Sequence, residues 1–352
     1  MKRLLILTSD FIPNIGGIAA NTLNLFNLLK RKHKVDMYVF GIAGKNFESV
    51  KYINKPKLLI PLYLKKILNS KKYDAVLVCT VLPIGWMLNL IKTDVKKIYF
   101  VYGQEILHDI VNPLKLREGV KSIIAQSEII VVNSNYTNGL IDGKGKVFYP
   151  LIEKISDSKE KTSSDSFTIL NVGRFVKHKN YFSMLRIIKD IDKETFNKTN
   201  KHVHLEIIGD GPLKDKFEQY IKNNDISKIV SISERINIEN LKKAYRKSDI
   251  ITLPSIKTKE NVEGFGIVAQ EAGLYGTVAV GYDSGGIRES IMDNDLIVKE
   301  NDETGLKILI VKLLTDKVFY NEKSKSATLR AEKFIAYERR LEEFERILDI
   351  KK

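Results

Sequence analysis

Two glutamates separated by seven residues enclose a glycine-rich turn in the second half of the chain. The turn lies within Asn261–Ala272 and follows the apolar stretch Ile250–Ser255. Glu263 should therefore lie in the loop after a strand, and Glu271 about one turn inside the next helix. Each carboxylate could hold sugar hydroxyls through charge-assisted hydrogen bonds. Considered alone, glutamates at such positions are more often solvated surface residues.

Backbone amides at the start of the same helix add a second kind of chemistry. The N–H groups of Phe265, Gly266 and Ile267 would have no acceptor within the helix, so they would form an anion site. Glycine lets a ligand approach the backbone closely. A phosphate bound to these amides would have one carboxylate on each side.

Two cations follow the first apolar stretch of the second half, within Asn171–Asn180. Gly173 permits a tight turn there. Arg174 and Lys179 could converge on one diphosphate and neutralise the charge that develops on a leaving group. Two neighbouring cations on their own are usually only a solvated face, so this pattern is weak in isolation.

Two further glycine turns have the same character. Pro13–Ala19 contains Gly16 and Gly17 and opens onto a helix, although it lacks the spacing of the dinucleotide fingerprint. It is well placed to meet a phosphate or a donor sugar. Asp283–Glu289 is a second such turn near the end of the chain's apolar strands.

Short apolar stretches alternate with amphipathic segments, which is typical of parallel βαβ units. In the first half we expect strands near 3–8, 35–40, 74–79, 97–101, 129–132 and 146–149, and helices near 17–32, 61–69, 84–92, 114–127 and 135–142. In the second half we expect strands near 167–172, 203–208, 229–232, 249–253, 277–281 and 295–298, and helices near 180–191, 212–224, 238–247, 266–275 and 302–314. The sequence predicts an α/β protein with two doubly wound, Rossmann-like sheets, whose strand-end loops hold the residues above.

The domain boundaries follow from composition. The stretch 153–166 is polar and rich in Ser and Lys, so it cannot pack and should be a linker between domains 1–152 and 167–319. The remaining segment, 320–352, is expected to be one amphipathic helix that could pack on either domain, including a crossing back to the first. Its apolar positions at spacings of three and four are Phe334, Tyr337, Leu341, Phe344 and Leu348.

Charge and hydropathy limit the classes of protein. The 352-residue chain has a net charge of +15, and residues 1–150 hold 22 Lys and Arg against 10 Asp and Glu. The basic first half suggests a polyanionic partner, either nucleic acid or an acidic membrane surface, although a lysine-rich proteome would explain it equally well. The single cysteine, Cys79, lies in an apolar run and should be buried. No stretch approaches the ~20 apolar residues that cross a bilayer, so we expect a cytoplasmic or peripheral protein.

Together the loops resemble the glycosyltransferase 4 family of retaining GT-B enzymes. The resemblance covers nearly the whole chain and is closest from 170 to 290. The matching stretches are Gly16-Gly17, Val172-Gly173-Arg174 with Lys179, Ile208-Gly209-Asp210-Gly211-Pro212-Leu213, Pro254-Ser255, the pair Glu263 and Glu271, and Gly285-Gly286-Ile287-Arg288-Glu289.

The resemblance implies a retaining glycosyltransferase of two Rossmann-like domains that face each other across a cleft. Arg174 and Lys179 would bind the diphosphate of a nucleotide-sugar donor, UDP- or GDP-linked. Glu263 would contact the donor sugar, and Glu271 would hold the ribose hydroxyls. The remaining donor-binding positions would be Gly16, Gly17, Gly173, Gly209, Gly211, Phe265, Gly266 and Ile267.

One departure concerns the end of the strand near 97–101. The family often has a histidine directly before the glycine, near the anomeric carbon, and here that residue is Tyr102. The role of that histidine does not carry over. Tyr102 could donate to a sugar hydroxyl and Glu105 could orient an acceptor, but a structural role is equally compatible with each. His108 is expected to be an ordinary surface or helix residue.

The same sequence contains patterns that are typical of other functions. Asp190-Ile191-Asp192 and Asp293-Asn294-Asp295 match the D-x-D pattern of metal-dependent transferases, but such patterns arise easily by chance, and we expect no catalytic metal and no cofactor. An epimerase of the same fold would use water in place of an acceptor. A non-catalytic nucleic-acid-binding protein would fit the charge, yet no recognition helix, zinc finger or aromatic-basic pattern supports nucleic acid as a partner.

The acceptor is suggested by charge. Lysines flank the apolar segment 60–68, and a second basic cluster ends the first helix. Basic residues beside an amphipathic stripe are typical of an interfacial membrane contact, so we expect a lipid-linked acceptor at an acidic membrane, with a soluble acceptor as the alternative. The two clusters are Lys65, Lys66, Lys71 and Lys72, and Lys30, Arg31, Lys32 and Lys34.

Overall fold

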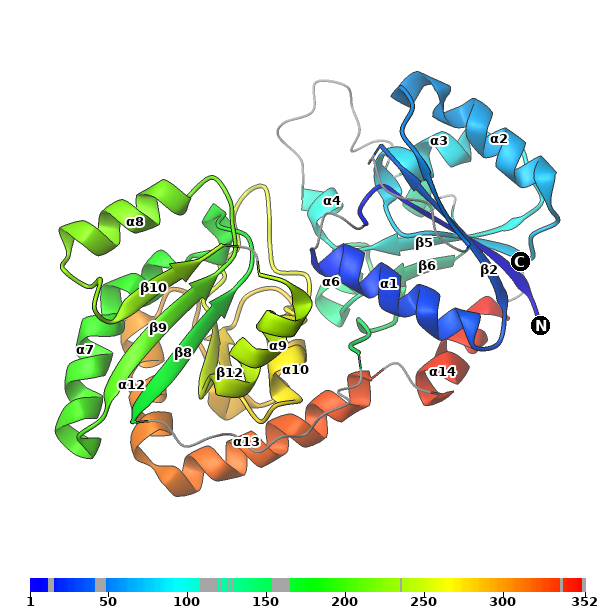
Figure 1. Ribbon diagram of the computed structural model, residues 1–352. Coiled ribbons are helices and arrows are strands. Elements are labelled where there is room, and N and C mark those ends of the chain that lie inside the picture. Colours follow the sequence, from blue (N-terminus) through cyan, green and yellow to red (C-terminus); the bar gives the residue numbers. More distant parts are fainter. Residues whose placement is uncertain are drawn as a thin grey trace. The chain divides into compact units, whose positions relative to one another are not determined.

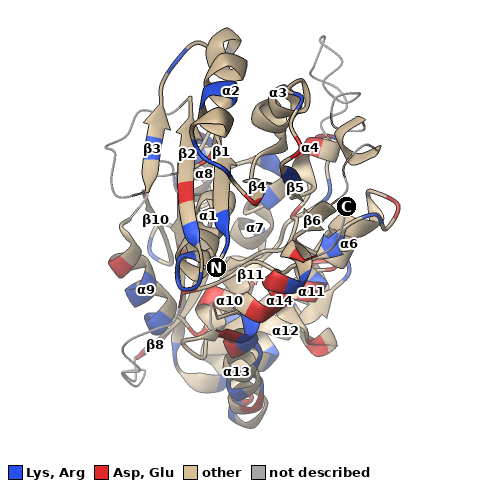
Figure 2. Ribbon diagram, turned by 90° about the vertical axis from the view of Figure 1, so that its right-hand side faces the viewer, with Lys and Arg blue, Asp and Glu red and all other residues tan. Residues whose placement is uncertain are grey.

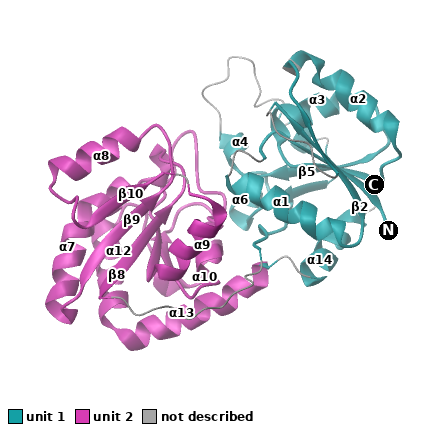
Figure 3. Ribbon diagram, in the orientation of Figure 1, with its two compact units in different colours: residues 1–153, 335–352 teal, residues 154–334 magenta. Residues whose placement is uncertain are grey.

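The computed structural model describes residues 1–11, 16–41, 49–107, 120, 122–125, 127, 129–153, 165–234, 236–335 and 338–349. The turn residues 13–15, His108, most of the helix expected at 114–127 and most of the linker expected at 153–166 lie outside the described residues. The chain forms two compact units, which are described separately. Unit 1 comprises residues 1–153 and 335–352, and unit 2 comprises residues 154–334 (Figure 3).

Unit 1 contains a parallel sheet with the strand order β3-β2-β1-β4-β5-β6-β7. Its strands are β1 (Arg3–Thr8), β2 (Lys34–Phe40), β3 (Val50–Ile53), β4 (Ala75–Val78), β5 (Lys96–Val101), β6 (Ile129–Val132) and β7 (Lys146–Val147). Its helices are α1 (Gly17–Lys30), α2 (Ile60–Ser70), α3 (Trp86–Asn89), α4 (Gln104–Leu107), α6 (Asn135–Gly139) and α14 (Glu338–Leu348), with short turns at Lys57–Leu59 and Val81–Gly85. The sequence did not predict strand β3, because this strand is short, has only one buried residue and lies at the sheet edge.

Unit 2 contains a parallel sheet with the strand order β10-β9-β8-β11-β12-β13. Its strands are β8 (Ser166–Val172), β9 (His202–Ile208), β10 (Val230–Ser233), β11 (Ile250–Leu253), β12 (Val278–Tyr282) and β13 (Ile297–Val298). Its helices are α7 (Phe182–Thr199), α8 (Lys214–Asn223), α9 (Ile238–Lys247), α10 (Val268–Gly273), α11 (Ile287–Ile291), α12 (Glu303–Thr315) and α13 (Lys317–Ala331), with 3-10 turns at Lys177–Lys179, Asn294–Leu296 and Glu332–Phe334.

Both sheets are buried on both faces, as expected of doubly wound domains. The inner strands β4, β6 and β11 are buried along their whole length because they are continuous runs of apolar or small residues. In unit 2, α7 packs on α12 and α10 packs on α9, and the two pairs lie on opposite sides of the sheet in Figure 1. The strand order reverses between β1 and β4 and between β8 and β11, so each unit has a topological switch point at the carboxyl ends of these strands.

The C-terminal segment differs from the expectation of one helix over 320–352. Helix α13 ends at Ala331, a 3-10 turn follows, and α14 begins at Glu338. Phe334 packs against Phe265 in unit 2, with 5.5 Å between ring centroids, whereas Phe344 packs on the aromatic rings of unit 1. A spacing of three and four residues fits two shorter helices as well as one, so the periodicity could not locate the break.

None of the helices formed by the described residues combines the length and apolar character needed to cross a membrane. The expectation of a buried thiol is met, because Cys79 is fully buried and burial raises its pKa to about 12.

Candidate active site

The loops after β8 and β11 meet at the switch point of unit 2. Lys179 ends the 3-10 turn after β8, and its Nζ lies 2.5 Å from Oε2 of Glu263, which belongs to the loop after β11. The two side chains are 18% and 14% exposed, so this ion pair is largely shielded from water. Arg174, in the same loop as Lys179, is exposed. The structure thus brings together one sequence-predicted cation and one sequence-predicted carboxylate.

Electrostatics fix the charge of Glu263. Burial alone would raise its pKa, but the charge and hydrogen bond of Lys179, together with a hydrogen bond from Ser255, lower the pKa below its usual value. The carboxylate is therefore ionised at neutral pH. Burial and the charge of Lys179 lower the pKa of His178 to about 4, so its imidazole is neutral. Of the two groups that face Glu263 from this loop, the Lys179 ammonium is therefore charged and the His178 imidazole is neutral.

Glu271 is held differently. It lies on α10, and the Tyr245 hydroxyl on α9 donates a 2.7 Å hydrogen bond to its Oε2. Burial raises the pKa of Glu271, and the bond from Tyr245 opposes that rise. Tyr245 was not singled out from the sequence, because an aromatic residue on an amphipathic helix is ordinarily part of the core. Only the packing of α9 on α10 brings the two together.

The backbone between the two glutamates makes a turn that requires a glycine at position 266. Gly266 has a φ of +85°, a region that L side chains rarely adopt. Its carbonyl accepts bonds from the Ala269 amide and the Ser290 hydroxyl, which fix the start of α10. Within the described part of the chain, no acceptor bonds the amides of Gly266 and Ile267. The Phe265 side chain is buried, so that residue can offer a ligand its backbone but not its ring.

Gly173, Gly209 and Gly211 allow the loop after β8 and the loop after β9 to pack closely. A Cβ on Gly209 would lie 1.9 Å from the Gly173 carbonyl oxygen, and one on Gly211 would lie 2.8 Å from the Phe175 backbone. The Phe175 amide donates to the Asp210 carbonyl at 2.8 Å. These glycines therefore allow close approach of backbone to backbone, which holds the loop that carries Arg174 and Lys179.

The turn at Asp283–Glu289 supports the Glu263 loop. A Cβ on Gly285 would lie 2.2 Å from the Glu263 carbonyl oxygen, and the Gly286 amide donates to the same oxygen at 2.9 Å. The glycines of this turn approach the backbone of the Glu263 loop. The turn therefore positions Glu263 through the main chain.

Four of the candidate residues lie in unit 1. Gly16 caps α1 and its carbonyl accepts the Ala20 amide, and Gly17 begins the helix. The Tyr102 hydroxyl is buried in the core next to Cys79, and burial raises its pKa well above the usual value. Glu105 accepts a 2.8 Å bond from the Tyr102 amide at the start of α4. Of the two roles left open for Tyr102 and Glu105, these contacts favour the structural one.

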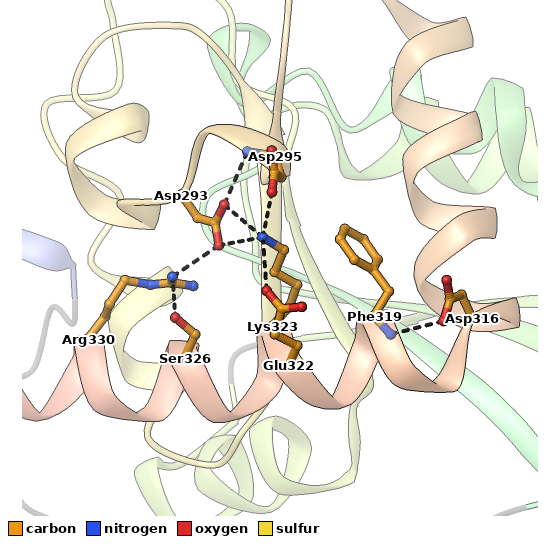
Figure 4. Close-up of polar contacts among 8 residues, drawn as sticks. All are labelled: Asp293, Asp295, Asp316, Phe319, Glu322, Lys323, Ser326 and Arg330. Atoms are coloured by element: carbon orange, nitrogen blue, oxygen red, sulfur yellow. Dashed lines mark hydrogen bonds and ion pairs between the residues drawn. The ribbon is translucent and has the colours of Figure 1, made fainter.

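The two D-x-D patterns are engaged in other contacts. Asp293 accepts from Lys323 at 3.2 Å and Arg330 at 3.1 Å, and Asp295 binds the same lysine at 2.7 Å (Figure 4). Asp192 accepts from the Val203 amide at 2.7 Å. Across the described residues, no three His, Cys, Asp or Glu side chains gather in an arrangement suited to a metal ion.

The fold is shared with enzymes of known structure. Sucrose-phosphate synthase from Thermosynechococcus elongatus superposes with a TM-score of 0.78 at 15% identity, covering 98% of both chains. HepE from Anabaena, solved in complex with UDP and glucose, superposes with a TM-score of 0.77 at 17% identity, covering 99% of both chains. At these identities the likeness shows the fold, which is GT-B.

Sequence comparison gives the family. An uncharacterised glycosyltransferase of Methanocaldococcus jannaschii is 27% identical over 332 residues, 88% of both chains. A 41.2 kDa protein in the cps region of Klebsiella pneumoniae is 27% identical over 282 residues, 75% of this chain and 68% of that protein. The model of the family described as glycosyl transferases group 1 matches residues 153–334, which include the whole site of unit 2. This chain is therefore a glycosyltransferase that belongs to the group 1 family and has the GT-B fold.

Proposed function

We propose that the protein transfers a sugar from a nucleoside diphosphate to an acceptor hydroxyl with retention of the anomeric configuration. The observation that supports this most directly is the buried pair Lys179 and Glu263 at the switch point of unit 2, with Glu271 at the start of the adjacent α10. A cation can bind a diphosphate, and each of the two carboxylates can accept hydrogen bonds from the hydroxyls of a sugar or a ribose.

The residues divide the donor between them. Lys179 and Arg174 bind the diphosphate and neutralise the charge that grows on it as the glycosidic bond breaks. Glu263, ionised because of Lys179, accepts hydrogen bonds from sugar hydroxyls. Glu271 holds the ribose, and the amides of Gly266 and Ile267 complete the phosphate cradle. Attack from the face of the leaving phosphate, which accepts the acceptor's proton, accounts for retention.

Relatives support this donor and a surface-polysaccharide or glycolipid product. HepE has been solved with UDP-glucose. A structural neighbour, WaaG, is a glycosyltransferase involved in lipopolysaccharide biosynthesis. The lipopolysaccharide core biosynthesis glycosyltransferase LpsD of Rhizobium meliloti is 30% identical over 59 residues, 17% of this chain.

A thermal-shift screen with UDP, GDP, ADP and their sugars tests the donor. A nucleotide at about 100 times its dissociation constant should add about 2.7 kcal/mol of stability. The anomeric configuration of the product, read by NMR, tests retention. Absence of a shift with every nucleotide would contradict the donor site.

We further propose that transfer needs no metal, because Arg174 and Lys179 supply the positive charge that a divalent cation would otherwise provide. Turnover should survive an excess of EDTA. Complete loss of turnover in EDTA, restored by Mg²⁺ or Mn²⁺, would contradict this assignment.

The acceptor we propose is lipid-linked and reached from an acidic membrane through α2. The apolar residues of this segment differ in exposure. Ile60, Leu64 and Ile67 are buried in the core. Leu58 and Leu62 are 87% and 65% exposed, so these two could contact a membrane. Figure 2 shows basic positions along α2. Lys65 and Lys66 are exposed beside the two leucines, a combination typical of interfacial helices.

Part of the basic surface is already neutralised within unit 1. Lys71 pairs with Asp36, and the cluster that ends α1 pairs with α14 through Lys32 and Glu345. Vesicles of anionic lipid should therefore sediment the protein in a salt-sensitive manner, and Lys65→Glu with Lys66→Glu should weaken this. Lys32→Glu is the matched control. Failure to bind anionic vesicles would contradict the proposed membrane contact, but it would not bear on the donor site.

A further inference from the structure

We propose that Tyr245 is a positioning residue for the donor nucleotide: its hydroxyl orients the Glu271 carboxylate toward the two ribose hydroxyls. This inference rests on the proposed assignment of Glu271 to the ribose. The 2.7 Å bond from Tyr245 to Oε2 is the contact that carries it. Tyr245 is not itself placed against substrate.

The packing around Tyr245 holds its hydroxyl in an orientation that points toward Glu271. The tyrosine side chain is 2% exposed, and its ring lies 6.2 Å from that of Tyr275 with 27° between the planes. The Thr277 hydroxyl donates a 2.6 Å bond to the Tyr245 carbonyl and fixes that turn of α9. The Arg246 guanidinium covers the Tyr275 ring at 5.4 Å from its centroid. Tyr245 therefore acts as a rigid donor from α9 toward α10.

The carboxylate needs such a donor. A glutamate side chain has three rotatable bonds, and Glu271 lies on a helix of only six residues. Among the described residues, Tyr245 is the single hydrogen-bond donor to its side chain. Because this bond occupies Oε2, it leaves Oε1 and the remaining lone pairs in a fixed orientation for a pair of neighbouring ribose hydroxyls.

The test compares ribose discrimination in matched variants of the full chain. Dissociation constants for UDP, 2′-deoxy-UDP and 3′-deoxy-UDP, or for the GDP series if the screen selects guanine, are measured for wild type, Tyr245→Phe and Tyr275→Phe. Tyr275→Phe is the control, since within the described part of the chain the Tyr275 hydroxyl has no hydrogen-bond partner.

In wild type and Tyr275→Phe, removal of a ribose hydroxyl should weaken binding by about tenfold, the size of one lost hydrogen bond. Tyr245→Phe should bind UDP more weakly and the deoxy nucleotides as wild type does, so that discrimination disappears. Tyr245→Phe should add nothing to Glu271→Gln, because it acts through Glu271. If Tyr245→Phe fails to fold, Tyr245→Met serves in its place.

Full ribose discrimination in folded Tyr245→Phe would overturn the role of Tyr245 while the Glu271 assignment survives. If instead Glu271→Gln discriminates as wild type does, the assignment of Glu271 to the ribose is wrong, and the inference fails with it. A purely structural tyrosine would weaken all three nucleotides equally, which also contradicts the proposal.

Discussion

At the scale of the residue, the pKa values of two glutamates of one motif are shifted in opposite directions. Glu263 is paired with a buried ammonium and stays ionised, whereas Glu271 is paired with a neutral hydroxyl and has a raised pKa. Both are largely buried, so the difference lies in the partner and not in the exposure. Neither partner is adjacent to its glutamate in the sequence.

The two cations of the first loop should affect catalysis more than nucleotide binding. Arg174→Ala and Lys179→Ala should each slow turnover by about 10²–10³, because charge on the leaving diphosphate is greatest in the transition state. Lys177→Ala is the control, since Lys177 is exposed on the same turn. Steady-state kinetics with direct nucleotide titration measures both effects. Normal turnover in the Arg174 and Lys179 variants would refute the assigned site.

The glutamates should also change the pH dependence of stability in opposite directions. The folded pKa of Glu263 is below its usual 4.5, so the stability it contributes is complete above about pH 4.5 and is lost as the pH falls through the folded value. The folded pKa of Glu271 is raised, so wild type should lose stability as the pH rises from 4.5 through that value. Urea unfolding of wild type, Glu263→Gln and Glu271→Gln from pH 3 to 7 resolves this; parallel curves would contradict it.

At the scale of the element, glycines set how closely the site loops approach one another. Gly285 has a φ of +60°, and a Cβ there would lie 2.2 Å from the Glu263 carbonyl oxygen. Gly285→Ala should cost about 1–3 kcal/mol of stability and weaken nucleotide binding, because the Glu263 loop must move. Gly139→Ala, in α6, meets nothing within 4 Å and should be harmless. Equal unfolding curves for the two variants would contradict this role.

Helix α13 is held within unit 2 by ion pairs to the second D-x-D pattern, Asp293-Asn294-Asp295. Asp293 is largely buried and bonds both Lys323 and Arg330, whereas Asp295 is 69% exposed. Asp293→Asn should therefore cost about 3 kcal/mol, because it removes the buried charge that Lys323 and Arg330 share. Asp295→Asn should cost less than about 1 kcal/mol. Chemical denaturation measures both, and equal costs would show that burial does not govern this network.

At the scale of the whole molecule, the chain leaves unit 2 and completes unit 1. Helix α14 inserts Phe344 between Phe100 and Phe148, with centroids 6.0 Å and 5.0 Å away, and Lys32 pairs with Glu345. Unit 1 consists of residues 1–153 and 335–352, and a parallel bridge between Ile152 and Ile335 joins the end of the first segment to the start of the second. Helix α14 is therefore part of the same hydrophobic core as strand β1.

Phe344→Ala should destabilise unit 1 by roughly 3–5 kcal/mol, because it empties a fully buried aromatic site. The melting transition that a bound nucleotide raises should stay in place, because that transition belongs to unit 2. Leu329→Ala is the control, since Leu329 is 57% exposed. Calorimetry with and without nucleotide separates the two units; loss of only the nucleotide-sensitive transition would contradict this division.

The sequence by itself determined the α/β class, the two sheets, the loops that hold Lys179 and Glu263, and the helix that carries Glu271. These follow from local rules, because apolar runs make buried strands and strand-end loops gather at one edge of a parallel sheet. The sequence also correctly suggested buried Cys79. It missed β3, a strand of four residues of which only Val50 is buried, so that it lacks a clear apolar run.

Tertiary structure alone decided which side chains meet. The Lys179–Glu263 and Tyr245–Glu271 contacts join residues 84 and 26 positions apart, and no local periodicity encodes such a pairing. Local periodicity also does not encode the ion pairs of Asp293 or the burial of the Tyr102 hydroxyl in the core. The division of the C-terminal segment into α13 and α14 also depends on packing, because Phe334 contacts unit 2 and Phe344 contacts unit 1. Residue types set the chemistry that is available; burial and partner choice, which depend on the packed fold, set the charge and direction of each group.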